Sequence, residues 1–218
     1  MRIKALCFII LLLPLLTGCF DLVEEITIHN NGSGTFVFEA NLSQSKTKIK
    51  TMMALDSMDG IKIPSIKELN KEMDKAKGIL LASDGISNFT ESRNFDDFIF
   101  SSHFDFRDVT CLNKALSTLF KAFNPGVSPP ENSYQFDNHT FTRKNDYNGR
   151  QEIKKIQKKE IALLGSANMT CIYRFDTDIK EFSNKDAKLS KSGKALFLKL
   201  PIPDLVNGTK NISNTIKL

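Results

Sequence analysis

The stretch FDDFIFSSHFDF, residues Phe95–Phe106, carries the strongest strand pattern in the chain. Four aromatic side chains share one face of it with the period of two that is typical of a strand: Phe98, Phe100, Phe104 and Phe106. The opposite face is polar. Four Phe side chains on one face need a thick apolar layer against them, so the stretch predicts a strand whose aromatic face lies in the core.

The next segment is expected to supply that layer. Asp108 is a good helix N-cap, and the residues after it follow the helical period: Val109, Leu112, Leu116, Leu119, Phe120 and Phe123. Asn124-Pro125-Gly126 ends the pattern. We therefore expect an amphipathic helix to pack on the strand.

The remaining chain adds hairpins and further helices. Asn31-Gly32 predicts a turn between strands at 26–28 and 35–42. A helix is expected at 43–58, and Ser65 and Glu68 have capping-box spacing at the start of another. Further strands are expected at 86–93, 134–136, 141–143, 168–176, 179–182, 187–190 and 195–200. The predicted class is α+β, a curved antiparallel sheet of hairpins with two or three helices packed against one face.

The first nineteen residues have the layout of an export signal. Arg2 and Lys4 precede an apolar run that is too short to span a bilayer, which needs ~20 apolar residues. The run closes with Leu16-Thr17-Gly18-Cys19, which resembles the lipobox of bacterial lipoproteins. The resemblance implies cleavage before Cys19 and lipidation of its sulfur. An anchor that stays uncleaved, with an ordinary thiol at Cys19, is the alternative.

These features divide the chain into four parts. Residues 1–18 are the predicted signal peptide, 19–25 a lipidated tether, 26–206 a single α+β domain and 207–218 a polar, frayed tail. The resemblance implies a location in the bacterial cell envelope, held by the lipid on Cys19. Asp after the lipidated Cys marks inner-membrane retention in enterobacterial sorting. Because Phe20 occupies that position, the outer membrane is favoured over the inner.

A second resemblance lies near the C-terminal end. Residues 175–184 and 191–200 are similar to the closing strands of LppM-like bacterial lipoprotein domains, in which a hydrophobic strand, an Asn-containing turn, a Gly turn and an aromatic strand recur. Ile26-Thr27-Ile28 with Asn31-Gly32-Ser33-Gly34 also resembles the start of that family. The Pro-Gly usual in the closing strands is absent here. The resemblance implies an antiparallel sheet with helices against it, and contact with lipids.

Composition narrows the partners and cofactors. A formal net charge of +5, which falls once Arg2 and Lys4 leave with the signal, is too mild to indicate nucleic-acid binding. The Lys-rich segment 144–160 is expected to be a solvated helix, with headgroup contact as the alternative. No cofactor is expected. Cys111 and Cys171 could form a disulfide in an exported protein, or pack as two buried free thiols.

No catalytic motif is visible. His103 shares the polar face of its predicted strand with Asp97 and Asp105, which could supply metal ligands or an acid–base pair, although a solvent-facing strand normally carries such residues. We therefore expect no enzyme. The surplus of Phe and Met favours a protein that binds lipid or another apolar ligand between the Phe face and the helices, with Met52 and Met53 contributing. The alternatives are a filled core and a structural or assembly subunit that contacts an envelope protein.

Overall fold

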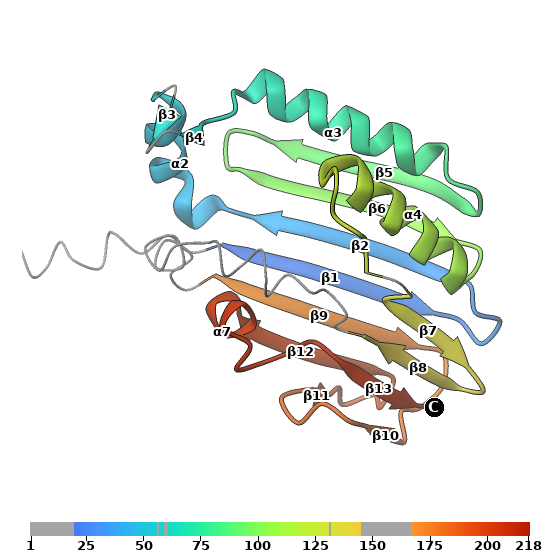
Figure 1. The fold of residues 1–218 in the computed structure, drawn as a ribbon. Coiled ribbons are helices and arrows are strands. Elements are labelled where there is room, and N and C mark those ends of the chain that lie inside the picture. The colour runs from blue at the N-terminus through green and yellow to red at the C-terminus, as the bar shows by residue number, and fades with distance from the viewer. Residues whose placement is uncertain (1–19, 56, 59–60, 131, 145–166) are drawn as a thin grey trace, which may run out of the picture.

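The computed structural model describes residues 20–55, 57–58, 61–130, 132–144 and 167–218. A seven-stranded sheet forms the backbone of the fold (Figure 1). In order across the sheet, its strands are β11 (Lys188–Leu189), β12 (Ala195–Pro201), β9 (Asn168–Phe175), β1 (Asp21–Ile28), β2 (Gly34–Asn41), β6 (Ile99–Phe106) and β5 (Ile86–Asn94). The predicted α+β class is confirmed.

The sheet departs from the predicted all-antiparallel pattern at its centre. β1 pairs antiparallel with β2 but parallel with β9, with Glu24 opposite Phe38 on one side and Cys171 on the other. A parallel pair needs a long crossover, because the chain must return to the same end before the second strand starts. Here the whole span between β2 and β9 makes that crossover, so local turn signals could not predict the pairing.

Two long helices cover the half of the sheet formed by β2, β6 and β5 (Figure 1). α3 (Ile66–Leu81) begins with the predicted capping box, in which the Ser65 side chain accepts from the Glu68 amide. α4 (Val109–Phe123) begins at Asp108, whose carboxylate accepts from the Cys111 amide at 2.8 Å. α3 packs against β5 and α4, whereas α4 also contacts β6 and β7.

A smaller four-stranded sheet covers the other half (Figure 1). Its order is β10 (Glu181–Phe182), β13 (Asn214–Lys217), β8 (Thr140–Arg143) and β7 (Tyr134–Asp137). Phe141 of β8 is fully buried and contacts Tyr134, Tyr173 and Phe175 at ring-centroid distances of 6.3, 5.3 and 5.7 Å. This half of the interior is densely packed with aromatic and aliphatic side chains.

The chain turns within the stretch that was predicted to be one strand. Residues 95–98 form the turn between β5 and β6, and Phe98 has a positive φ of 56°. The Asn94 side chain accepts from the Asp97 amide at 2.9 Å, which stabilises the turn. Phe98 is buried, but the face that it was predicted to share with Phe100, Phe104 and Phe106 begins only after Ile99.

Two other segments differ from prediction. The helix expected at 43–58 is shorter: a 3₁₀ turn, η2 (Ser43–Ser45), leads into α2 (Lys46–Met53), and a small hairpin of β3 (Ser57–Met58) and β4 (Ile61–Lys62) follows. The prediction of a frayed tail at 207–218 is wrong for the last residues of the chain. After α7 (Ile202–Asn207), strand β13 pairs with both β8 and β10, and Leu218 is buried.

Several predictions lie outside the described residues. These are the signal peptide at 1–18, the lipidation site Cys19 and all of the Lys-rich segment except Lys144. Within the part of the chain that the structure describes, no helix has the length and apolar character needed to cross a membrane.

Candidate functional site

The interface between the sheet and the helices is hollow. A cavity of about 620 Å³ lies between β2, β6 and β5 on one side and α3 and α4 on the other. The sheet contributes Phe36, Phe38, Ala40, Phe100 and Phe104 to its apolar lining. The helices contribute Met73, Ala76, Leu80, Leu116, Leu119 and Phe123. The half of the interior beneath the helices is therefore open, in contrast to the packed half beneath the small sheet.

A single row of residues crosses the cavity floor. Glu24 of β1 lies opposite Phe38 of β2, Phe38 lies opposite Ser102 of β6, and Ser102 lies opposite Glu91 of β5. Strands lie about 4.8 Å apart, so this row is ~14 Å long. Its middle carries Phe38, which is 36% exposed. Each end carries a carboxylate, so the apolar cavity is bounded by charge at both ends.

A buried ion pair forms the inner boundary. Arg143 Nε and Nη2 donate to the two Glu24 carboxylate oxygens at 3.2 and 3.3 Å. Arg143 Nη1 donates to the Lys144 carbonyl oxygen at 2.7 Å. The guanidinium lies 4.5 Å from the Tyr134 ring centroid. Removing two charges from water is costly, so the pair needs this bidentate geometry to persist next to an apolar space.

The Glu24 carboxylate keeps Arg143 charged, whereas the Tyr134 and Cys171 side chains beside the pair stay neutral. Burial alone would lower the pKa of Arg143, but the Glu24 carboxylate more than offsets this and holds the pKa above its usual range. Burial, reinforced by the negative charge of Glu24, raises the pKa of Tyr134. Burial also raises the pKa of Cys171, beside Glu24 in the sheet, to about 12. The thiol and the phenol are therefore neutral near pH 7.

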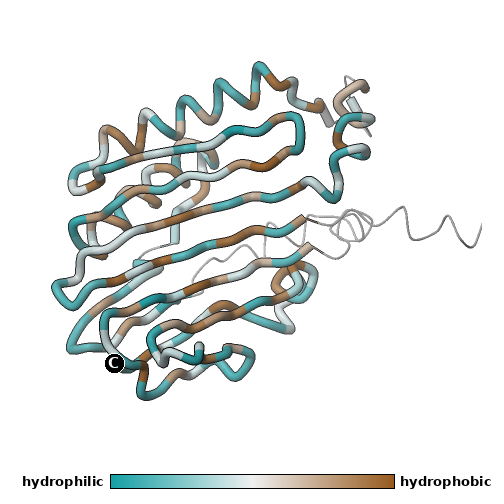
Figure 2. The backbone as a smooth tube through the Cα atoms, turned by 180° about the vertical axis from the view of Figure 1, so that it is seen from behind, coloured by the Kyte–Doolittle hydropathy of each residue, from teal (hydrophilic) through white to brown (hydrophobic). Residues whose placement is uncertain are grey.

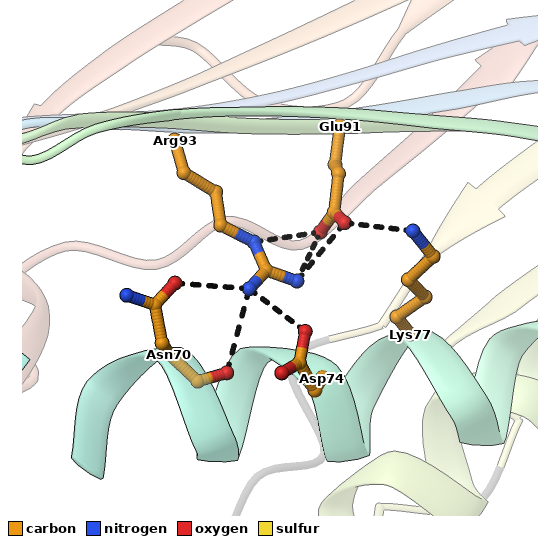
Figure 3. Close-up of polar contacts among 5 residues, drawn as sticks. All are labelled: Asn70, Asp74, Lys77, Glu91 and Arg93. Atoms are coloured by element: carbon orange, nitrogen blue, oxygen red, sulfur yellow. Dashed lines mark hydrogen bonds and ion pairs between the residues drawn. The ribbon is translucent and has the colours of Figure 1, made fainter. Parts of the chain in front are cut away.

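A second polar network forms the outer boundary (Figure 3). Arg93 of β5 binds Glu91 through Nε and Nη2, and its Nη1 contacts Asn70 Oδ1 at 3.1 Å and Asp74 Oδ1 at 2.9 Å on α3. Lys77 of α3 reaches back to Glu91 at 3.1 Å. Since Leu80 alone is buried along α3, this network is a principal attachment of the helix to the sheet.

The predicted apolar face is partly correct. Phe100 and Phe104 line the cavity, with Phe104 stacked on Phe36 at 5.2 Å, whereas Phe106 is buried in the core nearby and Phe98 lies in the turn. Met52 and Met53 do not line the cavity. They lie on α2, which ends before the small hairpin, and Met73 of α3 is the methionine that reaches the site.

Sequence reasoning missed the ion pair at the inner boundary. Glu24 interrupts a period-two pattern of apolar residues in β1, with Ile26 and Ile28 on the same buried face. A carboxylate at a core-facing position of a strand indicates a buried partner, and this signal is visible in the sequence. Its partner Arg143 could not have been chosen, because the two residues are 119 positions apart and only the packing of the two sheets brings them together.

The disulfide alternative is not formed. Cys111 and Cys171 are both free and buried. Cys111 lies in the first turn of α4, where Arg107 Nη2 contacts its sulfur at 3.1 Å, at the end of β6. Cys171 lies on β9, and β1 and β2 separate β9 from β6. Three strand spacings amount to ~14 Å, whereas a disulfide needs Cα atoms within about 7 Å.

The polar candidates on the strands do not converge. His103 lies 3.6 Å from Asp105, and both face away from the helices on β6. Asp97, predicted to share their face, lies in the turn and binds Lys46 at 2.6 Å. Among the residues with described positions, no group of three or more His, Cys, Asp or Glu side chains is arranged to hold a metal ion.

Among the described residues, no helix covers the reverse face of the large sheet (Figure 2). One row across it joins Phe197, Ile172, Glu25, Val37 and His103 through the strand register. Arg174, one pair along, binds Glu25 at 2.6 Å. Apolar and polar side chains are mixed on this face.

Comparison with known proteins adds little. No family model matches the chain, and no curated protein matches it. Among solved structures, the chain is similar to the folded domain of LppM from Mycobacterium tuberculosis, over 92% of this chain and 88% of that one, with 10% identity and a TM-score of 0.39. This is the kind of domain that the closing strands resemble in sequence. A TM-score this low establishes neither a shared fold nor a shared function.

Proposed function

We propose that this protein is a lipid-anchored cell-envelope protein that holds the acyl chain of a lipid in the cavity between the sheet and the helices. The observation that carries the proposal is the hollow interface, lined by Phe, Leu, Met and Ala side chains. The protein acts by binding rather than by catalysis, because the charged groups at both ends of the cavity are already neutralised by partners.

The size of the cavity fits a single chain. Its volume of about 620 Å³ lies within the range of ~300–1,000 Å³ typical of small-molecule sites. At ~30 Å³ for a group the size of a water molecule, it has room for roughly twenty methylene-sized groups. Transfer of each methylene from water to such a site contributes ~0.8 kcal/mol. An acyl chain would therefore gain substantial free energy from the cavity.

A lipid anchor on Cys19 would hold the cavity close to a membrane. The lipobox resemblance at Leu16-Thr17-Gly18-Cys19 supports lipidation of Cys19, and two or more acyl chains hold a protein stably on a membrane. The tether predicted at 19–25 is too long, because β1 already begins at Asp21 and leaves little chain between Cys19 and the fold. We propose that the outer membrane is the site of anchoring and that the cavity works next to the bilayer.

Cavity filling tests the proposal. In the Ala76→Leu variant, the larger side chain extends from α3 into the cavity, whereas Ala82→Leu places the same change at an exposed position beyond the end of that helix. Each protein is purified from host membranes, and the lipid that accompanies it is extracted and quantified by mass spectrometry. We expect Ala76→Leu to lower the lipid recovered per protein severalfold and Ala82→Leu to leave it unchanged.

Two outcomes count against the proposal. Equal lipid recovery from wild type and Ala76→Leu would remove the cavity as the binding site. Membrane fractionation of the same preparations tests the anchor: Cys19→Ser is expected to release the protein from the membrane or to leave its leader attached, and an unchanged mature mass would contradict lipidation.

A further inference from the structure

We infer that the cavity selects a single-chain lipid with an uncharged, oxygen-bearing head, and that the Glu24–Arg143 pair at the inner boundary binds that head. This inference rests on the proposed function and names its ligand class. The head would lie at the inner end of the floor, and the chain would run along Phe38 towards β5.

Arg143 has hydrogen-bonding capacity left over. Its guanidinium carries five N–H donors. Within the described chain, two of them bind Glu24 and one binds the Lys144 carbonyl, so two N–H groups have no acceptor there. Arg143 is nearly buried and lines the cavity. A pure hydrocarbon that displaced water from this end of the cavity would leave these donors unmet, whereas a hydroxyl or ester oxygen would satisfy them.

Because the Glu24–Arg143 pair is neutral as a whole, it disfavours a ligand with an ionised head. Glu24 already neutralises Arg143 through two hydrogen bonds. A carboxylate or phosphate at the same place would bring an extra negative charge into a buried site next to Glu24, and burying an uncompensated charge is costly. The neutral phenol of Tyr134 beside the pair adds no positive charge. The site is therefore complementary to an uncharged oxygen.

The outer boundary cannot offer the same binding site. Arg93 has a contact for each of its five N–H donors, because Nε and Nη2 make three with Glu91 and Nη1 makes one each with Asn70 and Asp74. Both oxygens of Glu91 accept hydrogen bonds from Arg93, and one also accepts from Lys77. Lys77 lines the cavity too and has N–H groups beyond the one bound to Glu91, but its side chain is 43% exposed, so water satisfies them. A ligand oxygen therefore gains more at the buried Arg143 than here.

Native mass spectrometry of the full-length protein, released from detergent micelles, measures the selectivity. The probes are 1-monolauroylglycerol and laurate, which share a chain and differ in head charge, at a pH where laurate is ionised. For the wild type we expect the monoacylglycerol adduct to form at a roughly ten- to hundredfold lower concentration than the laurate adduct, the range for a hydrogen bond to a charged group. Ala76→Leu should lower both adducts severalfold, so an adduct that persists undiminished in this variant reports binding to the protein surface.

Two variants separate the head site from the cavity. Glu24→Gln removes the neutralising charge, so laurate binding should improve at least tenfold and approach or pass that of the monoacylglycerol. Glu24→Leu with Arg143→Met replaces the pair by apolar side chains of similar volume, a change that buried pairs tolerate. This double variant should still bind both probes but should discriminate less than about threefold.

The outcomes distinguish the two claims. If neither probe binds the wild type, the proposed function fails. If the wild type binds both but prefers laurate or does not discriminate, or if the double variant keeps the preference for the monoacylglycerol, the headgroup inference is overturned while acyl-chain binding stands.

Discussion

Asp108 fixes the start of α4, the helix that forms one wall of the cavity. Its carboxylate accepts from the Cys111 amide, and it also lies 3.4 Å from Arg107 Nε. The backbone hydrogen bond is the main reason why the pKa of Asp108 lies below its ordinary value. The negative charge also complements the positive end of the helix dipole. One side chain therefore positions Leu116, Leu119 and Phe123 over the sheet.

Replacing Asp108 tests this role. Asp108→Ala should cost about 1 kcal/mol of unfolding free energy, the typical value for a lost N-cap, measured by urea denaturation. Since the pKa is lower in the folded state, the charge stabilises the fold above about pH 4, and this stabilisation is lost as the pH falls through the folded-state pKa.

Asp108→Asn is the matched control, because it keeps a capping oxygen but cannot titrate. It should retain most of the stability at pH 7 and show a flatter decline between pH 5 and pH 3, a range set by the ordinary Asp pKa of ~3.9. Equal stability of the Ala variant and the wild type at pH 7 would show that the cap is unimportant.

At the scale of elements, α3 is held differently from α4. α4 buries Val109, Cys111, Leu112 and Ala115, whereas α3 buries Leu80 alone among its sixteen residues. The network of Arg93, Glu91, Lys77, Asp74 and Asn70 compensates by joining α3 to the edge strand β5 (Figure 3). A helix attached by polar contacts at the edge of a cavity opens more easily than one attached by apolar burial.

Arg93→Ala should therefore loosen α3 selectively. We expect faster amide hydrogen exchange in α3 but not in α4, and a loss of roughly 1.5–3 kcal/mol of unfolding free energy, the range for a hydrogen bond to a charged group. Arg174→Ala is the control, because it removes an arginine bound to Glu25 on the reverse face of the same sheet. Equal effects of both variants on α3 exchange would contradict the attachment.

The same network predicts a pH dependence. Burial alone would raise the pKa of Glu91, but the hydrogen bonds from Arg93 and Lys77 outweigh it, and the pKa is lowered. Its contribution is present above the ordinary Glu pKa of ~4.3 and disappears as the pH falls through the lower folded-state value. The difference in thermal midpoint between wild type and Arg93→Ala should shrink accordingly below about pH 4.

Local signals in the sequence predicted the elements but not their assembly. The Ser65 capping box, the Asp108 cap and the Asn31-Gly32 hairpin are all confirmed, because each depends on residues close together in the chain. The parallel pairing of β1 with β9 and the Glu24–Arg143 pair depend on contacts across more than one hundred residues. The second sheet joins a local hairpin to strands that lie far along the chain, such as β13 with β8. Phe98 was misassigned because the turn that follows Asn94 extends through residues 95–98 and delays the start of β6 to Ile99.

At the scale of the whole molecule, the interior is asymmetric. Beneath the small sheet, Phe141, Tyr173 and Leu198 are buried almost completely and fill the space. Beneath the helices, Phe38 and Phe123 remain more than one third exposed around the cavity. A filled core was the competing expectation from sequence, and a Phe-rich pattern is compatible with either. Only the placement of α3 and α4 separates the hollow arrangement from the filled one.

Photo-crosslinking tests that asymmetry most directly. Phe38 and Phe197 are almost equally exposed, at 36% and 37%, but Phe38 lines the cavity and Phe197 lies on the reverse face of the sheet. Each is replaced in turn by p-benzoyl-phenylalanine in the full-length protein, the cells are irradiated, and lipid adducts are measured by mass spectrometry. A cavity that holds an acyl chain predicts a strong lipid adduct at position 38 and little at position 197; equal adducts at both positions, or none at position 38, would contradict it.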